Sequence, residues 1–177
     1  MFGRQRNRIA IQFRKVCDLA AESCYLRAMG DTIKDVMRIE CPATTAFDLM
    51  ADVRNELDWN SGVSEVELLT AEPIGKGSRF RIVDQRGQQE VKITTYKRPD
   101  TLSLFLSGKS MDVDIDFTLV EQGNITVMTG RFNAKVRGLM RFFFPLLVPL
   151  IRRDIAKEHK TFIALCEAKA SAQSTDK

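Results

Sequence analysis

Few side chains in this sequence have the type and position that chemistry would need, and His159 is the first of them. It is the only histidine in the chain, and it follows Ile155 by four residues and precedes Phe162 by three. Residues at this spacing share one face of a helix, so the imidazole is expected beside an apolar stripe, where it could donate or accept a proton. The alternative is a histidine at the edge of the stripe that bonds to the backbone or to water. Both interpretations remain open at the level of the sequence.

Tyr96 and Arg131 are further polar candidates, and both fall on segments with strand character. Simple alternation leaves Tyr96, Arg131 and Asn133 off the apolar face, so each would need a β-bulge to turn it toward a core. A bulge is expected near Gly130, because the apolar phase of the last predicted strand changes there.

Motifs for metal, phosphate or nucleophilic chemistry are missing from the sequence. It contains no G-x-S-x-G, no phosphate-binding glycine loop and no H-E-x-x-H. The four cysteines are widely spaced, which predicts free buried thiols rather than a zinc site. Asp112, Asp114 and Asp116 lack the glycine turn and the distal glutamate of a calcium loop, so they are expected on a solvated outer face. The sequence thus predicts neither a metal nor a cofactor.

The positive charge is concentrated at the start of the chain. Residues 1–30 hold six basic and two acidic side chains, whereas the remaining residues hold 21 of each. The body therefore has no net basic charge with which to neutralise phosphates, and no nucleic-acid partner is expected. No apolar run reaches the length of a membrane span, and Arg14, Lys15 and Asp18 interrupt the N-terminal stretch, which makes it a poor secretory signal. We expect a cytoplasmic protein that associates with membranes, if at all, through its basic N-terminus.

Residues 1–30 form an extension with three open interpretations. They are a poorly ordered tail, which the composition favours, or a basic amphipathic helix that binds anionic lipid. In the third interpretation the protein starts at Met29, just before the domain pattern begins. Residues 31–170 are expected to form the domain, and residues 171–177 a polar tail.

The domain pattern is one strand, two helical segments, six strands and a long helix. The expected elements are Thr32–Cys41, Ala43–Val53, Arg54–Trp59, Val63–Thr70, Ser78–Asp84, Glu90–Lys97, Thr101–Ser107, Ser110–Val120, Ile125–Val136 and Gly138–Ala170. Within the last of these, Pro145 and Pro149 predict that the helix starts or kinks there.

Two apolar patterns indicate how these elements pack. In Ser110–Val120 the apolar side chains alternate strictly with polar ones, as in a half-buried antiparallel strand. The apolar members are Met111, Val113, Ile115, Phe117 and Leu119. In the long helix, Val148, Ile151, Ile155, Phe162 and Cys166 recur at helical spacing. An amphipathic helix after a run of strands buries its stripe against the sheet, which predicts an α+β fold.

The pattern resembles the START-like, or SRPBCC, superfamily, and within it the polyketide cyclase/dehydrase-type branch. The resemblance covers about Ile33–Ala168 and rests on Pro42-Ala43, Ala46–Asp52, Trp59, Val63, Val66, Glu67, Gly75-Lys76-Gly77 and Arg79. It implies a helix-grip fold, in which an antiparallel sheet of about seven strands wraps around the long C-terminal helix. It also implies a deep apolar cavity between that sheet and helix. Because this superfamily hosts many activities, the resemblance is informative for fold and weak for function.

On this basis the leading hypothesis is a domain that binds a hydrophobic small molecule, such as a lipid, quinone or polyketide-like compound. The expected ligand-binding residues are Trp59, Phe80, Met111, Val113, Ile115, Phe117, Arg131, Ile155 and Phe162. The alternative is a cyclase or dehydratase-type enzyme that uses His159 and Tyr96. Relatives that place an arginine and a tyrosine in the cavity motivate this alternative. A third hypothesis is a peripheral membrane or partner-binding module that works through residues 1–28 and Phe142–Ile151.

Overall fold

The computed structural model describes residues 32–85 and 87–175. The predictions for the basic extension therefore lie outside the described residues. The elements, in chain order, are β1 (Thr32–Ile39), α2 (Ala43–Ala51), the 3-10 turn η1 (Val53–Asn55), α3 (Glu56–Trp59), β2 (Val63–Leu68), β3 (Arg79–Asp84), β4 (Gly87–Lys97), β5 (Thr101–Ser107), β6 (Met111–Gln122), β7 (Ile125–Val136) and α4 (Met140–Thr175). Residues 171–175, assigned above to a polar tail, continue the helix.

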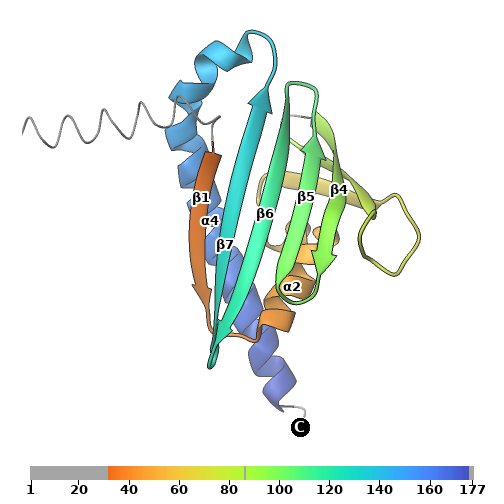
Figure 1. The fold of residues 1–177 in the computed structure, drawn as a ribbon, viewed down its shortest axis with the longest axis vertical. Helices are drawn as coiled ribbons and strands as arrows, with labels where there is room; N and C mark the ends of the chain where they lie inside the picture. Colours follow the sequence, from red (N-terminus) through yellow and green to blue (C-terminus); the bar gives the residue numbers. More distant parts are fainter. Residues whose placement is uncertain (1–31, 86, 176–177) are drawn as a thin grey trace, which may run out of the picture. The chain divides into compact units, whose positions relative to one another are not determined.

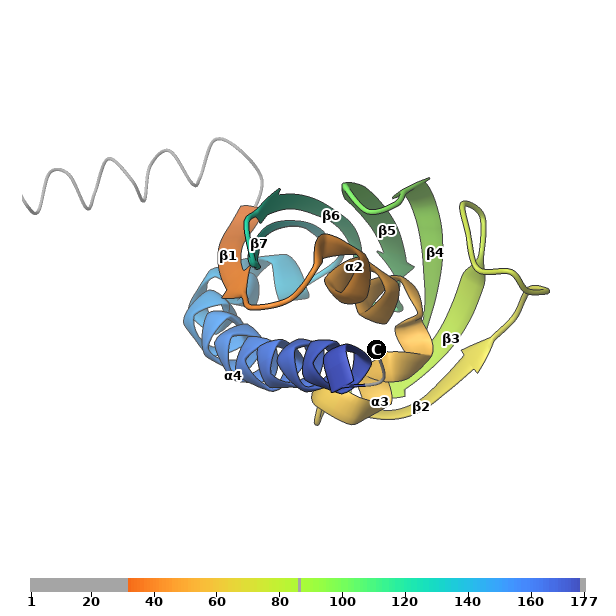
Figure 2. The same cartoon turned by 90° about the horizontal axis from the view of Figure 1, so that it is seen from below.

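The strands form a single antiparallel sheet in the order β1-β7-β6-β5-β4-β3-β2. From β2 to β7, strands that follow one another in sequence are neighbours in the sheet. The first strand, β1, lies beside β7 and forms one edge of the sheet, and β2 forms the other edge (Figure 1). Viewed along the strands, the sheet curves around α2 and α4 (Figure 2). The predicted α+β fold, with seven antiparallel strands around a C-terminal helix, is confirmed.

The strands β6 and β7 pair without interruption from Met111–Val136 to Gln122–Ile125. The predicted bulge near Gly130 is therefore wrong. Gly130 instead leaves room for two aromatic rings, because a Cβ at this position would lie 3.1 Å from atoms of both Phe117 and Phe132. Those two rings meet edge to face, with their centroids 5.9 Å apart. The glycine is required by close packing on the inner face of the sheet and not by a change of register.

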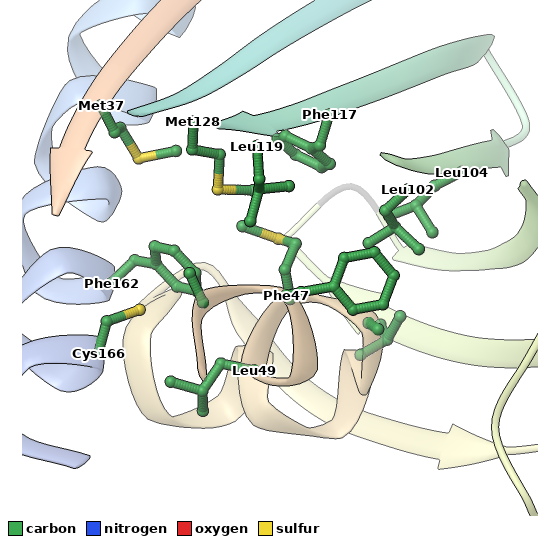
Figure 3. Packing of buried hydrophobic residues seen from close by; sticks show 14 of the residues in the cluster. Met37, Phe47, Leu49, Leu102, Leu104, Phe117, Leu119, Met128, Phe162 and Cys166 are labelled. Carbon is green, nitrogen blue, oxygen red and sulfur yellow. The ribbon is translucent and has the colours of Figure 1, made fainter. Parts of the chain in front are cut away.

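The core lies between α2, the sheet and the second half of α4. Side chains from all three converge there, among them Phe47, Leu119, Met128, Phe162 and Cys166 (Figure 3). The start of α2 is fixed to β6, because the amide of Ala43 donates a hydrogen bond to Glu121 Oε2 at 2.8 Å. This bond satisfies one of the amides that every helix leaves unpaired in its first turn.

The helix α4 runs for 36 residues and buries the predicted stripe. Phe162 and Cys166 are fully buried, whereas Val148, Ile151 and Ile155 are half-buried. The helix begins before both prolines, and its first turns run at an angle to the remainder (Figure 1). Proline removes a helical hydrogen bond, which accounts for such a bend. Within residues 32–85 and 87–175, no helix is both long and apolar enough to span a bilayer.

Candidate functional site

The inner face of the sheet changes from buried to half-buried along β5, β6 and β7. At the end near α2, Leu102, Phe117 and Met128 are at most 4% exposed. Toward the opposite end of these strands, the side chains that point to the same inner face are only half-buried. These half-buried residues are Leu106, Met111, Val113, Ile115, Phe132 and Ala134. We call this set the half-buried inner face.

On the side of α4 that packs toward the sheet, the half-buried residues lie between Phe144, which is 3% exposed, and the buried second half of the helix. His159, Phe162 and Cys166 are buried, and the residues of the stripe that precede them, including Ile151 and Ile155, are half-buried. Two apolar surfaces, one on the sheet and one on the helix, therefore keep part of their area accessible although both point into the domain. Such surfaces are what a hydrophobic ligand needs.

The predicted ligand-binding residues divide between this face and the closed core. Met111, Val113 and Ile115 belong to the half-buried inner face, and Ile155 lies on the half-buried part of α4. By contrast, Phe80, Phe117 and Phe162 are at most 4% exposed and pack in the core. The alternation of β6 is as predicted, since Asp112, Asp114 and Asp116 take the opposite phase.

The outer phase of β6 and β7 carries charged pairs. Lys135 Nζ lies 2.8 Å from Asp114 Oδ2, and Arg137 pairs with Asp112. Arg131, which sits opposite Asp116, is exposed on this outer face. The inward orientation that its prediction as a ligand-binding residue required is not found, because no bulge in β7 turns it inward. Within the described part of the chain, no three metal-ligating side chains cluster.

Tyr96 does face inward, and a bulge is the reason. The register of β4 against β5 shifts between Ile93 and Thr95, which places Tyr96 opposite Leu102 on the inner face. Its ring meets Phe47 of α2 edge to face at 5.0 Å. It also lines a surface pocket of about 320 Å³ beside α2. Strands β5, β6 and β7 separate it from β1, where His159 finds its partner, so the two predicted catalytic residues are not brought together.

His159 lies against Asp35 of β1, a residue that the sequence reasoning missed. Nδ1 of the imidazole is 2.5 Å from Asp35 Oδ2. Burial lowers the pKa of His159 from its ordinary value, and the carboxylate of Asp35 opposes that shift. The imidazole is therefore mostly neutral at pH 7. The alternation of β1 could have identified Asp35. It lies two residues from each of the buried Ile33 and Met37, so its side chain points to the same face of the strand.

Trp59 serves as a packing anchor between α3 and α4. Its ring meets the ring of Phe162 edge to face, with the centroids 5.4 Å apart. It also lines a pocket of about 230 Å³, together with Asn60, Ser61 and Thr161. Its indole Nε1 is buried and has no hydrogen-bond partner in the structure. A polar ligand atom or a water molecule at this place would satisfy that donor.

Two of the predicted free cysteines lie in the described residues. Cys41 and Cys166 are both buried, and neither forms a disulfide. The two thiols interact with each other, which lowers the pKa of Cys41 and raises that of Cys166. They join the segment before α2 to the second half of α4, inside the closed core.

Comparison with solved structures identifies proteins of similar fold. No family model and no curated protein matches the chain. Among solved structures, a conserved protein from Geobacillus kaustophilus has a TM-score of 0.62 and 15% identity, with 76% of this chain and 94% of that chain covered. Ara h 8.0201 has a TM-score of 0.59 and 11% identity, with coverage of 76% and 96%.

A START superfamily protein from Mycobacterium smegmatis has a TM-score of 0.57 and 13% identity, with 80% of this chain and 98% of that chain covered. At these identities the similarity concerns the arrangement of elements and leaves the activity open. It agrees with the curved sheet and the long helix described above. This chain has the START-like, helix-grip fold.

Proposed function

We propose that this protein binds a hydrophobic small molecule between the half-buried inner face and α4. The observation that carries the proposal is the burial gradient. Apolar side chains on both the sheet and the helix point into the domain, yet stay only half-buried at one end. A folded chain gains free energy by covering such surface, about 25 cal/mol for each Å², and an apolar ligand would supply the cover.

The side chains that line the proposed site indicate which class of ligand it would bind. Met111, Val113 and Ile115 offer no hydrogen-bonding side chain, so most of the binding free energy would come from removing apolar ligand surface from water. The pair of His159 and Asp35, one helical turn after the half-buried Ile155, provides a polar group that could orient a carbonyl or hydroxyl. A lipid, a quinone or a polyketide-like compound has that combination of a large apolar body and few polar atoms.

An enzyme of cyclase or dehydratase type is the alternative, and the contact between His159 and Asp35 favours it. A carboxylate beside a histidine is a recurrent arrangement for proton transfer. Without Tyr96 nearby, His159 would have to act with Asp35 alone. His159→Ala separates the two functions: a carrier should keep its affinity within about threefold, since apolar area dominates. An enzyme should still bind but lose about 10²–10⁴ in rate.

The binding proposal is tested by filling the site. Ile155→Trp adds bulk on the half-buried part of α4 and should reduce the affinity for 1-anilinonaphthalene-8-sulfonate by excluded volume. The protein should stay folded, because overpacking a closed core costs about 1–3 kcal/mol and this site is not closed. Ala164→Trp is the matched control, since Ala164 is exposed on the same helix and should leave the affinity unchanged. If the wild type binds no probe and Ile155→Trp unfolds the domain, the interior is a closed core and the proposal fails.

A further inference from the structure

The start of α4 carries a second apolar face, which points away from the sheet. Among the residues whose side chains the structure describes, the four most exposed large apolar ones are Leu139, Phe142, Leu146 and Leu150, between 55% and 77% exposed. Their spacing of three, four and four residues places them along one face of the chain. We call these four residues the apolar tip.

The apolar tip lies outside the hydrophobic core, since none of its four residues belongs to the buried cluster. Helical spacing places Val148, Ile151 and Ile155 on the opposite side of the helix, and these three residues are half-buried. A soluble domain seldom leaves several large apolar side chains exposed side by side, unless the patch meets another surface. The apolar tip is therefore expected to bind another surface.

Positive charge follows the apolar tip along the same face of the helix. Arg153, Lys157 and Lys160 are exposed and continue the spacing at three, four and three residues. With a rise of about 1.5 Å per residue, Arg153 lies about 4.5 Å beyond Leu150 along the helix axis, and Lys160 about 15 Å beyond. The acidic residue Asp154 is turned about 100° around the helix from Arg153.

A turn of the sheet adds further positive charge at this end of the domain. The backbone amide of Arg137 donates a hydrogen bond to the carbonyl of Ser110 at 2.9 Å, which holds the β5–β6 turn beside the start of α4. Lys109 in that turn is exposed. The half-buried inner face lies at the same end, because β5 ends and β6 begins there (Figure 1).

We propose that this end of the domain docks on an anionic lipid surface. The apolar tip would enter the boundary between headgroups and acyl chains, to a depth of about 5–10 Å, while Arg153, Lys157 and Lys109 remain among the lipid phosphates. An apolar face bordered by basic side chains matches both layers of such a surface. Docking would also bring the half-buried inner face next to the membrane, where hydrophobic ligands are stored. The proposal does not depend on ligand binding, since the tip points away from the interior.

The test is cosedimentation of the full chain with vesicles of equimolar phosphatidylcholine and phosphatidylglycerol, compared with vesicles of phosphatidylcholine alone. We expect binding to the anionic vesicles, weakened by added salt. Phe142→Ser combined with Leu146→Ser should weaken it by at least about tenfold, the scale of one buried large apolar side chain. Arg153→Gln combined with Lys157→Gln should weaken it about fivefold for each charge removed.

The matched control is Val36→Ser combined with Leu69→Ser, which removes exposed apolar side chains elsewhere and should leave vesicle binding unchanged. The basic residues before Met29 are the same in every variant, so they cannot account for a difference. Absence of binding to anionic vesicles would overturn the proposal, as would an equal loss in the control. Self-association that Phe142→Ser with Leu146→Ser abolishes, without vesicle binding, would assign the tip to a second copy of the chain. Ile155→Trp should keep vesicle binding, which separates this test from that of the ligand site.

Discussion

The imidazole of His159 in α4 and the carboxylate of Asp35 in β1 meet with Nδ1 and Oδ2 2.5 Å apart. The contact joins the first strand of the domain to its last helix, on the inner side of the sheet. His159 is 8% exposed, and burial lowers its pKa. The pair is therefore both a polar feature of the proposed site and a determinant of stability.

The first prediction concerns the pH dependence of folding. Because the pKa of His159 is lower in the folded protein than in the unfolded chain, the unfolded chain binds the proton more readily. The stability due to the neutral imidazole is fully present above about pH 6.5 and is lost as the pH falls through the lower, folded-state pKa. Urea unfolding at pH 7.5 and pH 5.0 should show a larger loss for the wild type than for His159→Gln.

Asp35→Asn provides the control for that prediction. The carboxylate raises the pKa of His159 and so opposes the effect of burial. Removing its charge should lower the pKa further and steepen the loss of stability on acidification. Equal losses in the wild type, His159→Gln and Asp35→Asn would show that the imidazole does not contribute.

The second prediction concerns Gly130. A Cβ at this position meets the rings of Phe117 and Phe132 at 3.1 Å, and both rings already pack on each other. Gly130→Val should therefore destabilise the fold by about 1–3 kcal/mol, measured by urea unfolding. Gly75→Val is the comparison, because a Cβ at Gly75 has nothing within 4 Å, and its change should stay within about 0.5 kcal/mol. Similar losses at both sites would rule out the steric explanation.

The third prediction concerns the contact between Phe162 and Trp59. Phe162 is fully buried, so Phe162→Ala should cost about 3–5 kcal/mol in the free energy of unfolding. Trp59 is the only tryptophan, and its fluorescence emission should shift as its ring loses this neighbour. Lys169→Ala, on the exposed side of α4 and outside the pocket that Trp59 lines, should alter neither quantity. An unchanged emission spectrum in Phe162→Ala would show that the two rings are not in contact in solution.

The fourth prediction concerns the basic extension. Every residue of the described hydrophobic core lies after the basic extension, within Ile33–Lys177. A chain that starts at Met29 should therefore melt within about 3 °C of the full chain in differential scanning calorimetry. Aggregation or a much larger decrease would mean that the extension packs on the domain.

The sequence by itself determined the order of the elements and the faces that they bury. The alternation of Met111, Val113 and Ile115 and the helical stripe around Phe162 are local periodicities, and each records which side of an element faces the core. Both were correct in the structure.

Only the tertiary structure decided which groups meet. The inward turn of Tyr96 results from a register shift against the neighbouring strand, and the role of Gly130 results from rings on two strands. The contact of Asp35 with His159 joins two residues that lie near opposite ends of the domain's sequence. The half-buried end of the inner face and the exposed apolar tip likewise depend on where α4 lies across the sheet. No local pattern encodes these relationships, because each is a property of two segments brought together by folding and not of either segment alone.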